Sequence, residues 1–246
     1  MFYWILKHLL LGPFLRLAHR PRATGLENVP ETGPAILASN HLSFIDSLFL
    51  PLLLNRKVVF LGKSEYFDSW RTRWFVRSVG VIPVRREGGA AADAAIRAGI
   101  KALREGHVVA LYPEGTRSPD GRLYRGKTGV ARMALEAQAP VIPVCVKGTE
   151  RVMPLGARVP RLAGRVELTY GAPLRFERYY DRARDRFVLR SVTDEIMYEI
   201  MMLSDQEYVD EYASKVKKDL ATPPATTAPE AETERQPAPS EAPRPE

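Results

Sequence analysis

The sequence predicts a single α/β domain in which a mostly parallel or mixed central sheet is covered by helices on both faces. Two observations indicate this fold class. Short apolar runs alternate with apolar residues at helical spacing from Pro34 onward, and Gly106 and Pro140 close two of the helical patterns just before the next apolar run. Strands that alternate with helices are typical of such a sheet. A chain of 246 residues is long enough for one large domain.

Residues 1–25 are expected to form an apolar and basic segment ahead of the domain. The leucines and aromatics of residues 1–18 are interrupted by charged residues and by the Gly12-Pro13 pair, so the run is too short and broken to span a membrane. Aromatic and leucine side chains flanked by basic residues are typical of a helix that lies in the membrane interface. A first helix packed on the domain is the alternative.

The domain itself is expected to span residues 26–218. The apolar runs predict strands at residues 35–39, 57–61, 81–84, 107–112, 141–146 and 165–170. Apolar residues at helical spacing predict helices around residues 96–103, 130–138 and 185–203, and a helix-like apolar run covers residues 45–54.

Residues 219–246 are expected to be a disordered tail. Beyond about Leu220 the composition changes to Pro, Ala, Thr and Glu without large apolar side chains. Such a segment cannot bury enough surface to offset the loss of chain entropy on folding.

The body of the chain is strongly basic. The last 25 residues carry five Glu and two Arg, a net charge of −3, so the total of +7 corresponds to +10 over residues 1–221. This charge favours anionic partners, namely a lipid surface, phosphorylated substrates, an acidic carrier protein or nucleic acid. The single Cys145 excludes an internal disulfide and suits a reducing compartment.

The first stretch with chemical potential is Asn40-His41-Leu42-Ser43-Phe44-Ile45-Asp46, where a strand-like run gives way to a helix-like run. At such a junction His41 and Asp46 are placed to share a hydrogen bond, and an imidazole oriented in this way can take a proton from an alcohol. The alternative is a satisfied interior histidine, with Asp46 as a first-turn carboxylate that favours the helix N-terminus.

Three further stretches place polar or cationic groups at the ends of sheet elements. Strand 107–112 leads into Pro113-Glu114-Gly115-Thr116-Arg117, strand 81–84 leads into Arg85-Arg86, and Gly126-Lys127-Thr128-Gly129 precedes a helix. Ligands bind at the carboxyl edge of open α/β sheets, and a helix N-terminus beside a lysine is a ready phosphate site. We therefore expect Arg86, Arg117 and Lys127 to form one anion pocket, with Glu114 holding Arg117 or accepting hydroxyls from a polyol. Solvated surface charges and ion pairs are the alternative.

A different class of protein is suggested by residues 121–128, which match the phosphate-cradling pattern G-x-x-x-x-G-K-[ST]. A P-loop follows directly on a buried strand, whereas here residues 114–120 intervene, and no apolar strand ends in an Asp to serve as Walker B. A P-loop nucleotide-binding protein is therefore the less favoured alternative. The sequence lacks the G-x-S-x-G and H-E-x-x-H patterns and Cys/His metal spacing, so we expect no metal site.

In their order and spacing these motifs resemble the glycerophospholipid acyltransferases, specifically the bacterial 1-acylglycerol-3-phosphate acyltransferases. The resemblance covers roughly residues 34–148, and residues 126–129 look like the lysine-glycine element of the family. The family often has Phe-Ile-Asp-Arg where this chain has Pro-Val-Arg-Arg, so Arg86 inherits the family arginine while Arg85 replaces an acid. The matching blocks are Asn40–Asp46, Gly80–Arg86, Tyr112–Arg117 and Val141–Val144.

The resemblance implies that a fatty acyl thioester, either acyl-CoA or acyl-carrier protein, is the donor. The acceptor would be the free hydroxyl of 1-acylglycerol 3-phosphate, and the product phosphatidic acid for phospholipid synthesis. His41 would act as general base, and Asp46 would fix the tautomer of its imidazole. The acceptor's phosphate and glycerol would be held by Arg86, Glu114, Gly115, Thr116, Arg117 and Lys127.

The same resemblance sets expectations for partners and place in the cell. The partners would be an anionic membrane surface, a lysophospholipid acceptor and an acyl thioester, with no nucleic acid and no resident cofactor. The enzyme would be peripheral or monotopic at the cytoplasmic face of the cell membrane. Glycerol 3-phosphate, another lysophospholipid or a glycolipid remain open as acceptors, since the same base chemistry serves them all.

Overall fold

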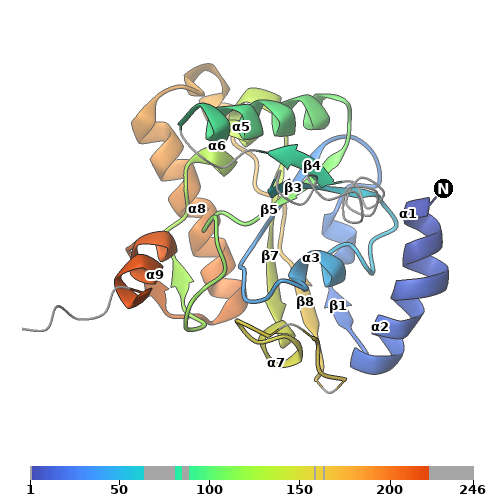
Figure 1. Ribbon diagram of the computed structural model, residues 1–246. Coiled ribbons are helices and arrows are strands. Elements are labelled where there is room, and N and C mark those ends of the chain that lie inside the picture. The colour runs from blue at the N-terminus through green and yellow to red at the C-terminus, as the bar shows by residue number, and fades with distance from the viewer. Residues whose placement is uncertain (1, 64–80, 85–88, 158, 163, 222–246) are drawn as a thin grey trace, which may run out of the picture.

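The computed structural model describes residues 2–63, 81–84, 89–157, 159–162 and 164–221 (Figure 1). Within these residues a seven-stranded sheet has the order β1-β8-β7-β2-β5-β3-β4, and β6 and β9 form a second, two-stranded sheet. Strands β7, β2, β5, β3 and β4 run parallel to one another, whereas β8 is antiparallel to β7. The predicted α/β class with a mixed, mostly parallel sheet is confirmed.

All six predicted strands are present, and three more were not predicted. The strands are β1 (Arg22–Thr24), β2 (Ala35–Ser39), β3 (Val58–Lys63), β4 (Val81–Val84), β5 (Val108–Leu111), β6 (Leu123–Tyr124), β7 (Val141–Lys147), β8 (Glu167–Tyr170) and β9 (Tyr208–Val209). The α-helices are α1 (Phe2–Ile5), α2 (Leu11–His19), α3 (Asp46–Phe49), α5 (Gly89–Arg104), α6 (Gly129–Ala137), α7 (Thr149–Val152), α8 (Arg186–Ser204) and α9 (Ala213–Ala221). Short 3-10 helices cover Leu26–Asn28 and Glu177–Arg182.

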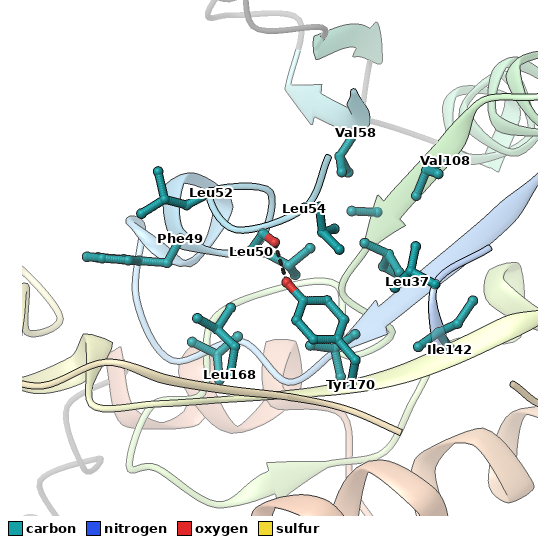
Figure 2. Close-up of a cluster of buried hydrophobic side chains, with 14 of the residues drawn as sticks. Leu37, Phe49, Leu50, Leu52, Leu54, Val58, Val108, Ile142, Leu168 and Tyr170 are labelled. Carbon is teal, nitrogen blue, oxygen red and sulfur yellow. Dashed lines mark hydrogen bonds between the residues drawn. The ribbon is translucent and has the colours of Figure 1, made fainter. Parts of the chain in front are cut away.

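The two faces of the sheet bury separate apolar clusters, because successive side chains of a strand point to opposite faces. On β2, Ala35 and Leu37 join the cluster beneath α2 and α3, whereas Ile36 and Ala38 join the cluster beneath α5, α6 and α8. Figure 1 shows these two groups of helices on opposite sides of the sheet. Figure 2 shows the first cluster, in which the Tyr170 hydroxyl donates to the Leu50 carbonyl. Burial on both faces explains why the first four residues of β2 are all apolar.

The helix predicted from the apolar run 45–54 is shorter in the structure. Helix α3 covers only Asp46–Phe49, and turns continue the chain toward β3. The reason is Pro51, which has no N–H to donate and whose ring would clash with the carbonyl four residues earlier. The run nevertheless packs into the core, since Phe49, Leu50, Leu52 and Leu54 are buried.

The N-terminal segment is helical from Phe2 to His19, in spite of the Gly12-Pro13 pair. A π-helical turn at Leu6–Leu10 joins α1 to α2. Proline at position 13 cannot supply the regular hydrogen bond of an α-helix, and a π turn just before it widens the backbone locally. Within the described residues, no helix is long and apolar enough to cross a membrane.

This helix presents its apolar side chains outward. Tyr3, Leu15 and His19 are buried, and Lys7 points inward, where its ammonium donates to the Leu54 carbonyl. Removal from solvent lowers the pKa of Lys7 to about 8. The outer face leaves a row of large apolar residues exposed: Trp4, Ile5, Leu9, Leu10, Phe14 and Leu17.

The ends of the domain extend slightly beyond the expected boundaries of 26 and 218. Strand β1 pairs in parallel with β8, so Arg22–Thr24 belongs to the sheet although it lies within the expected N-terminal segment. Helix α9 reaches Ala221, three residues into the expected tail. The rest of that tail, residues 222–246, lies outside the described residues.

Candidate active site

His41 and Asp46 lie at the carboxyl end of β2 and share a hydrogen bond. His41 Nδ1 is 2.8 Å from Asp46 Oδ2, and the same oxygen accepts from the N–H groups of Leu42 and Ser43 at 2.8 and 2.9 Å. The Asp46 side chain is fully buried, whereas the His41 side chain remains 16% exposed. A carboxylate held by two backbone N–H groups cannot rotate freely, so it fixes the orientation of the ring. This geometry places the proton on Nδ1 and makes Nε2 the basic nitrogen.

The loop after β5, which carries the motif Tyr112–Arg117 (the third motif), holds the backbone of His41 in the motif Asn40–Asp46 (the first motif) on both sides. Strands β2 and β5 are neighbours, with Ala38 opposite Leu111, so the loops that follow them meet at the carboxyl edge of the sheet. The His41 N–H donates to Glu114 Oε1 at 3.2 Å, and the His41 carbonyl accepts from the Ser118 N–H at 2.7 Å. The first and third motifs therefore form one interlocked unit.

Tyr112 stacks on the imidazole of His41. The two ring centroids are 3.7 Å apart and the ring planes differ by 8°. The Tyr112 hydroxyl is 2.8 Å from Ser47 Oγ on α3, which holds the phenol in place. Removal from solvent and the nearby Asp46 carboxylate raise the pKa of Tyr112 well above its usual value, so the phenol stays neutral. When His41 takes a proton, the aromatic face of Tyr112 lies against the resulting cation, which is a favourable contact.

Glu114 is buried and its two carboxylate oxygens are occupied by backbone groups. Oε1 accepts from His41 and Oε2 accepts from the Tyr124 N–H at 3.0 Å. Burial raises the pKa of Glu114 to about 7, and the two backbone hydrogen bonds and Lys217 only partly oppose that rise. Among the described residues Glu114 forms no ion pair with Arg117. Its geometry is that of a support beneath His41, and the sequence did not reveal this environment.

The other predicted binding residues gather around the loop after β5. Gly115 has a φ of +74°, which favours glycine, and a side-chain carbon built there would lie 3.0 Å from Lys127 Cε. Lys127 therefore folds over Gly115, while its backbone N–H donates to the Pro113 carbonyl at 2.8 Å. Thr116 Oγ1 accepts from the ammonium of Lys217 on α9 at 2.9 Å. Gly115, Thr116, Arg117 and Lys127 are thus brought together beside His41.

Arg86 and Arg85 lie outside the described residues. The strand that leads to them, β4, is parallel to β3 and ends at Val84 on the same carboxyl edge as β2 and β5. The place of Arg86 in the anion pocket stays a prediction.

The segment 121–128 is not arranged as a phosphate cradle. A P-loop binds phosphates through its backbone N–H groups, but here these groups are used within the protein. Leu123 and Arg125 donate to carbonyls of residues 207–211, Tyr124 donates to Glu114, and Lys127 donates to Pro113. The segment also contains strand β6, whose side chains are fully buried. The nucleotide-binding alternative therefore loses its structural basis.

Several contacts of the site could not be found from the motifs alone. Asn40 exchanges two hydrogen bonds with the backbone of Val146 and also donates to Gln206, which ties β2, β7 and the segment after α8 together. Lys217 reaches the third motif from about a hundred residues away in the chain. Cys145 is buried, and burial raises its thiol pKa to about 12, so it is no nucleophile. In the described part of the chain, no group of acidic, His or Cys side chains is arranged to hold a metal ion.

Comparison with known proteins is consistent with this site. The model of the protein family described as Acyltransferase matches residues 20–147, slightly more than half of the chain. The chain is 32% identical to the chloroplastic 1-acyl-sn-glycerol-3-phosphate acyltransferase LPAT1 of Arabidopsis thaliana over 61% of its own length and 42% of that relative. It is 29% identical to the 1-acyl-sn-glycerol-3-phosphate acyltransferase of Bacillus subtilis, over 60% of its own length and 70% of that relative.

A solved structure shares the fold. The crystal structure of the 1-acyl-sn-glycerophosphate acyltransferase PlsC from Thermotoga maritima superimposes with a TM-score of 0.58, covers 80% of each chain and is 24% identical in sequence. The chain spans 42% and 39% of the length of two plant relatives it matches, from Arabidopsis thaliana and Brassica napus.

Proposed function

The chain belongs to the Acyltransferase family, and we propose that it transfers a fatty acyl group from a thioester to the free hydroxyl of 1-acylglycerol 3-phosphate. The product would be phosphatidic acid, and the donor acyl-CoA or acyl-carrier protein. The observation that carries this proposal is the His41–Asp46 pair, whose ring is held from its edge by a carboxylate and on its face by Tyr112.

The reaction needs no nucleophile from the protein. Nε2 of His41 takes the proton of the acceptor hydroxyl while its oxygen attacks the thioester carbonyl carbon. The tetrahedral intermediate collapses with loss of the thiolate, and the imidazolium returns the proton to that sulfur. Asp46 keeps the proton on Nδ1 and stabilises the imidazolium, as in a serine hydrolase triad from which the serine is missing.

The charge on the tetrahedral oxygen requires hydrogen-bond donors. Three backbone N–H groups near His41 cannot serve as these donors, because each already donates within the protein. Those of Leu42 and Ser43 donate to Asp46, and that of His41 donates to Glu114. Stabilisation of the negatively charged oxygen is therefore left to other donors of the site.

The acceptor's phosphate would be held by Arg117 and Lys127, and by Arg86 from the end of β4. Arg117 offers a planar fork suited to phosphate oxygens. Lys127 lies over Gly115 next to the loop that supports His41. This arrangement would set the phosphate at a fixed distance from the base, so that the hydroxyl of the glycerol reaches Nε2. Gly115 and Thr116 would contact the glycerol, and Glu114 would act from beneath through His41.

We also propose that the N-terminal helix rests in the interface of an anionic membrane, at its cytoplasmic face. Its exposed apolar row would enter the lipid, and Arg16 and Arg20, which are exposed on the same helix and at its end, would contact phosphate headgroups. This places the acceptor, a lipid, beside the domain that acylates it.

The membrane proposal is tested best by substitution, since removal of residues 1–20 would also remove buried Tyr3 and Leu15. Leu9 and Leu17 are 71% and 81% exposed, so changing both to Asp should leave the fold intact and greatly weaken flotation with phosphatidylglycerol vesicles. Phe187→Asp, at an 88% exposed position on α8, is the matched control and should float as the wild type does. Undiminished flotation of the Leu9→Asp/Leu17→Asp protein would refute the anchor.

An acceptor screen tests the reaction itself. The purified protein is given one radiolabelled acyl-CoA with 1-acylglycerol 3-phosphate, glycerol 3-phosphate, an uncharged lysolipid or a glycolipid. We expect the highest kcat/KM with 1-acylglycerol 3-phosphate and acylation of its free hydroxyl. A higher kcat/KM with any of the other acceptors would contradict the proposed substrate, and absence of transfer to all of them would contradict the reaction.

A further inference from the structure

The chain after α8 folds back onto the loop between the third motif and α6. Strand β9 pairs with β6, Leu123 donates to the Glu207 carbonyl at 2.9 Å, and Arg125 donates to the carbonyls of Val209 and Glu211 at 3.1 and 3.0 Å. These contacts use backbone groups on both sides, so they fix where α9 begins. The position of α9 relative to the third motif is therefore fixed by backbone hydrogen bonds of the domain.

In this position of α9, Lys217 contacts the third motif. The Lys217 ammonium donates to Thr116 Oγ1 at 2.9 Å and to the Arg117 carbonyl. Ala213, one turn earlier on the same helix, is fully buried, so this side of α9 faces the domain. Partial burial and the nearby Arg117 guanidinium lower the pKa of Lys217, while Glu114 opposes that shift.

Positive charge is therefore concentrated around one short loop. Lys127 lies over Gly115, Lys217 is bonded to Thr116, and Arg117 is close enough to Lys217 to repel it. Glu114 offsets only part of this charge at neutral pH, because burial raises its pKa to about 7 and leaves it partly protonated. Like charges held together in this way are destabilising until an anion binds between them.

We propose that Lys217 is a further cation of the acceptor's phosphate site, beside Arg117 and Lys127, supplied by a helix outside the region that matches the family. A phosphomonoester carries a charge of about −1.5 to −2 at pH 7 and three acceptor oxygens, which suits several cations. An ammonium carries three N–H donors, two of which are accounted for by Thr116 and Arg117. Among the residues that the structure describes, none accepts the third. The inference rests on the proposed function for the identity of the ligand.

The test measures how much the phosphate contributes to binding. The affinities of 1-hexanoylglycerol 3-phosphate and of 1-hexanoylglycerol are measured by calorimetry at low salt. The affinity for the phosphorylated ligand is divided by that for the unphosphorylated ligand, and this ratio is compared between the wild type and each variant. Loss of one charged hydrogen bond corresponds to about a tenfold change in affinity, so Lys217→Ala should lower the ratio by about tenfold. Lys217→Arg keeps the charge and should retain most of the ratio.

The control is Lys215→Ala, which removes the same charge from the same helix at an exposed position paired with Glu211. It should leave the ratio unchanged. A purely structural role for Lys217 would weaken both ligands alike and leave the ratio at the wild-type value, which would overturn the inference. An equal fall in Lys215→Ala would overturn it as well, because the effect would then be one of net charge.

The ratio also separates this inference from the proposed function. If the acceptor screen identified a different phosphorylated acceptor, the proposed substrate would fail while the Lys217 effect on the ratio persisted. If 1-acylglycerol 3-phosphate were the acceptor but the ratio did not depend on Lys217, the inference would fail and the reaction would stand.

Discussion

Replacement of Glu114 by Gln should remove a large part of the pH dependence of stability near neutral pH. Burial raises the pKa of Glu114 from 4.5 to about 7 in the folded protein. An acid whose pKa is raised by folding binds more protons in the folded state, so its contribution to stability is fully present below pH 4.5 and is lost as the pH rises through 7. A shift of this size corresponds to about 3 kcal/mol in total, of which about 2.5 kcal/mol falls between pH 5 and pH 8.

The assay is urea unfolding of the wild type and of Glu114→Gln across that pH range. At pH 5 the variant should be less stable by about 1–3 kcal/mol, because the NH2 group of Gln cannot accept a hydrogen bond and one of the N–H groups of His41 and Tyr124 loses its acceptor. On going to pH 8 the variant should gain about 2.5 kcal/mol relative to the wild type, since only the wild type must ionise a buried carboxyl, so the difference falls to near zero or reverses. Glu177→Gln, at an exposed site whose partner is Arg175, is the control and should show a nearly constant difference, since exposed carboxyl and guanidinium groups do not titrate between about pH 5 and 8. A constant difference for Glu114→Gln too would mean that the carboxyl is not buried as described.

Three further substitutions test the site itself. His41→Ala should reduce kcat by about 10²–10⁴-fold while thermal unfolding stays close to the wild type, because only the general base is removed; substantial transfer by the folded variant would contradict the assignment. Arg117→Ala should raise the KM for 1-acylglycerol 3-phosphate and leave the KM for acyl-CoA unchanged in steady-state assays; a change confined to acyl-chain preference would argue against phosphate binding. Tyr112→Phe keeps the ring on His41 and should stay near wild-type kcat, whereas Tyr112→Leu removes an aromatic–cation contact of about 1–2 kcal/mol and should lower kcat by about tenfold; equal losses in both variants would assign the effect to the hydroxyl and Ser47.

The features that sequence reasoning could predict are local. The strand that ends at Ser39 and the histidine and carboxylate that follow it lie within one short window, so their contact depends little on the rest of the fold. The apolar runs identified six strands because burial on both faces leaves no polar alternation to obscure them. Strand β1 was missed for the opposite reason: Arg22–Thr24 is short and mostly exposed, and its pairing with β8 carries no local signal.

What escaped prediction depends on which distant segments meet. A glutamate at position 114 of this motif could face solvent or support His41, and the sequence of the motif is the same in both cases. Glu114 supports His41 because β2 and β5 are adjacent in the sheet. Lys217 is one basic residue among several near the C-terminal end, and its contact with Thr116 exists because β9 pairs with β6. The N-terminal helix shows a third case, in which a π turn accommodates the Gly12-Pro13 pair that would otherwise predict a break.

The structure separates the parts of the site that would set the rate from those that would select the acceptor. The His41 backbone is held at its N–H by Glu114 and at its carbonyl by Ser118, and its ring is held by Asp46 and Tyr112. These contacts are all made by groups of the protein itself, so the orientation of the base does not depend on contacts with the acceptor. The cations gather around the same loop, and one of them comes from α9. Substitutions at Asp46 or Tyr112 should therefore act mainly on kcat, and those at Arg117 or Lys217 mainly on the KM of a phosphorylated acceptor.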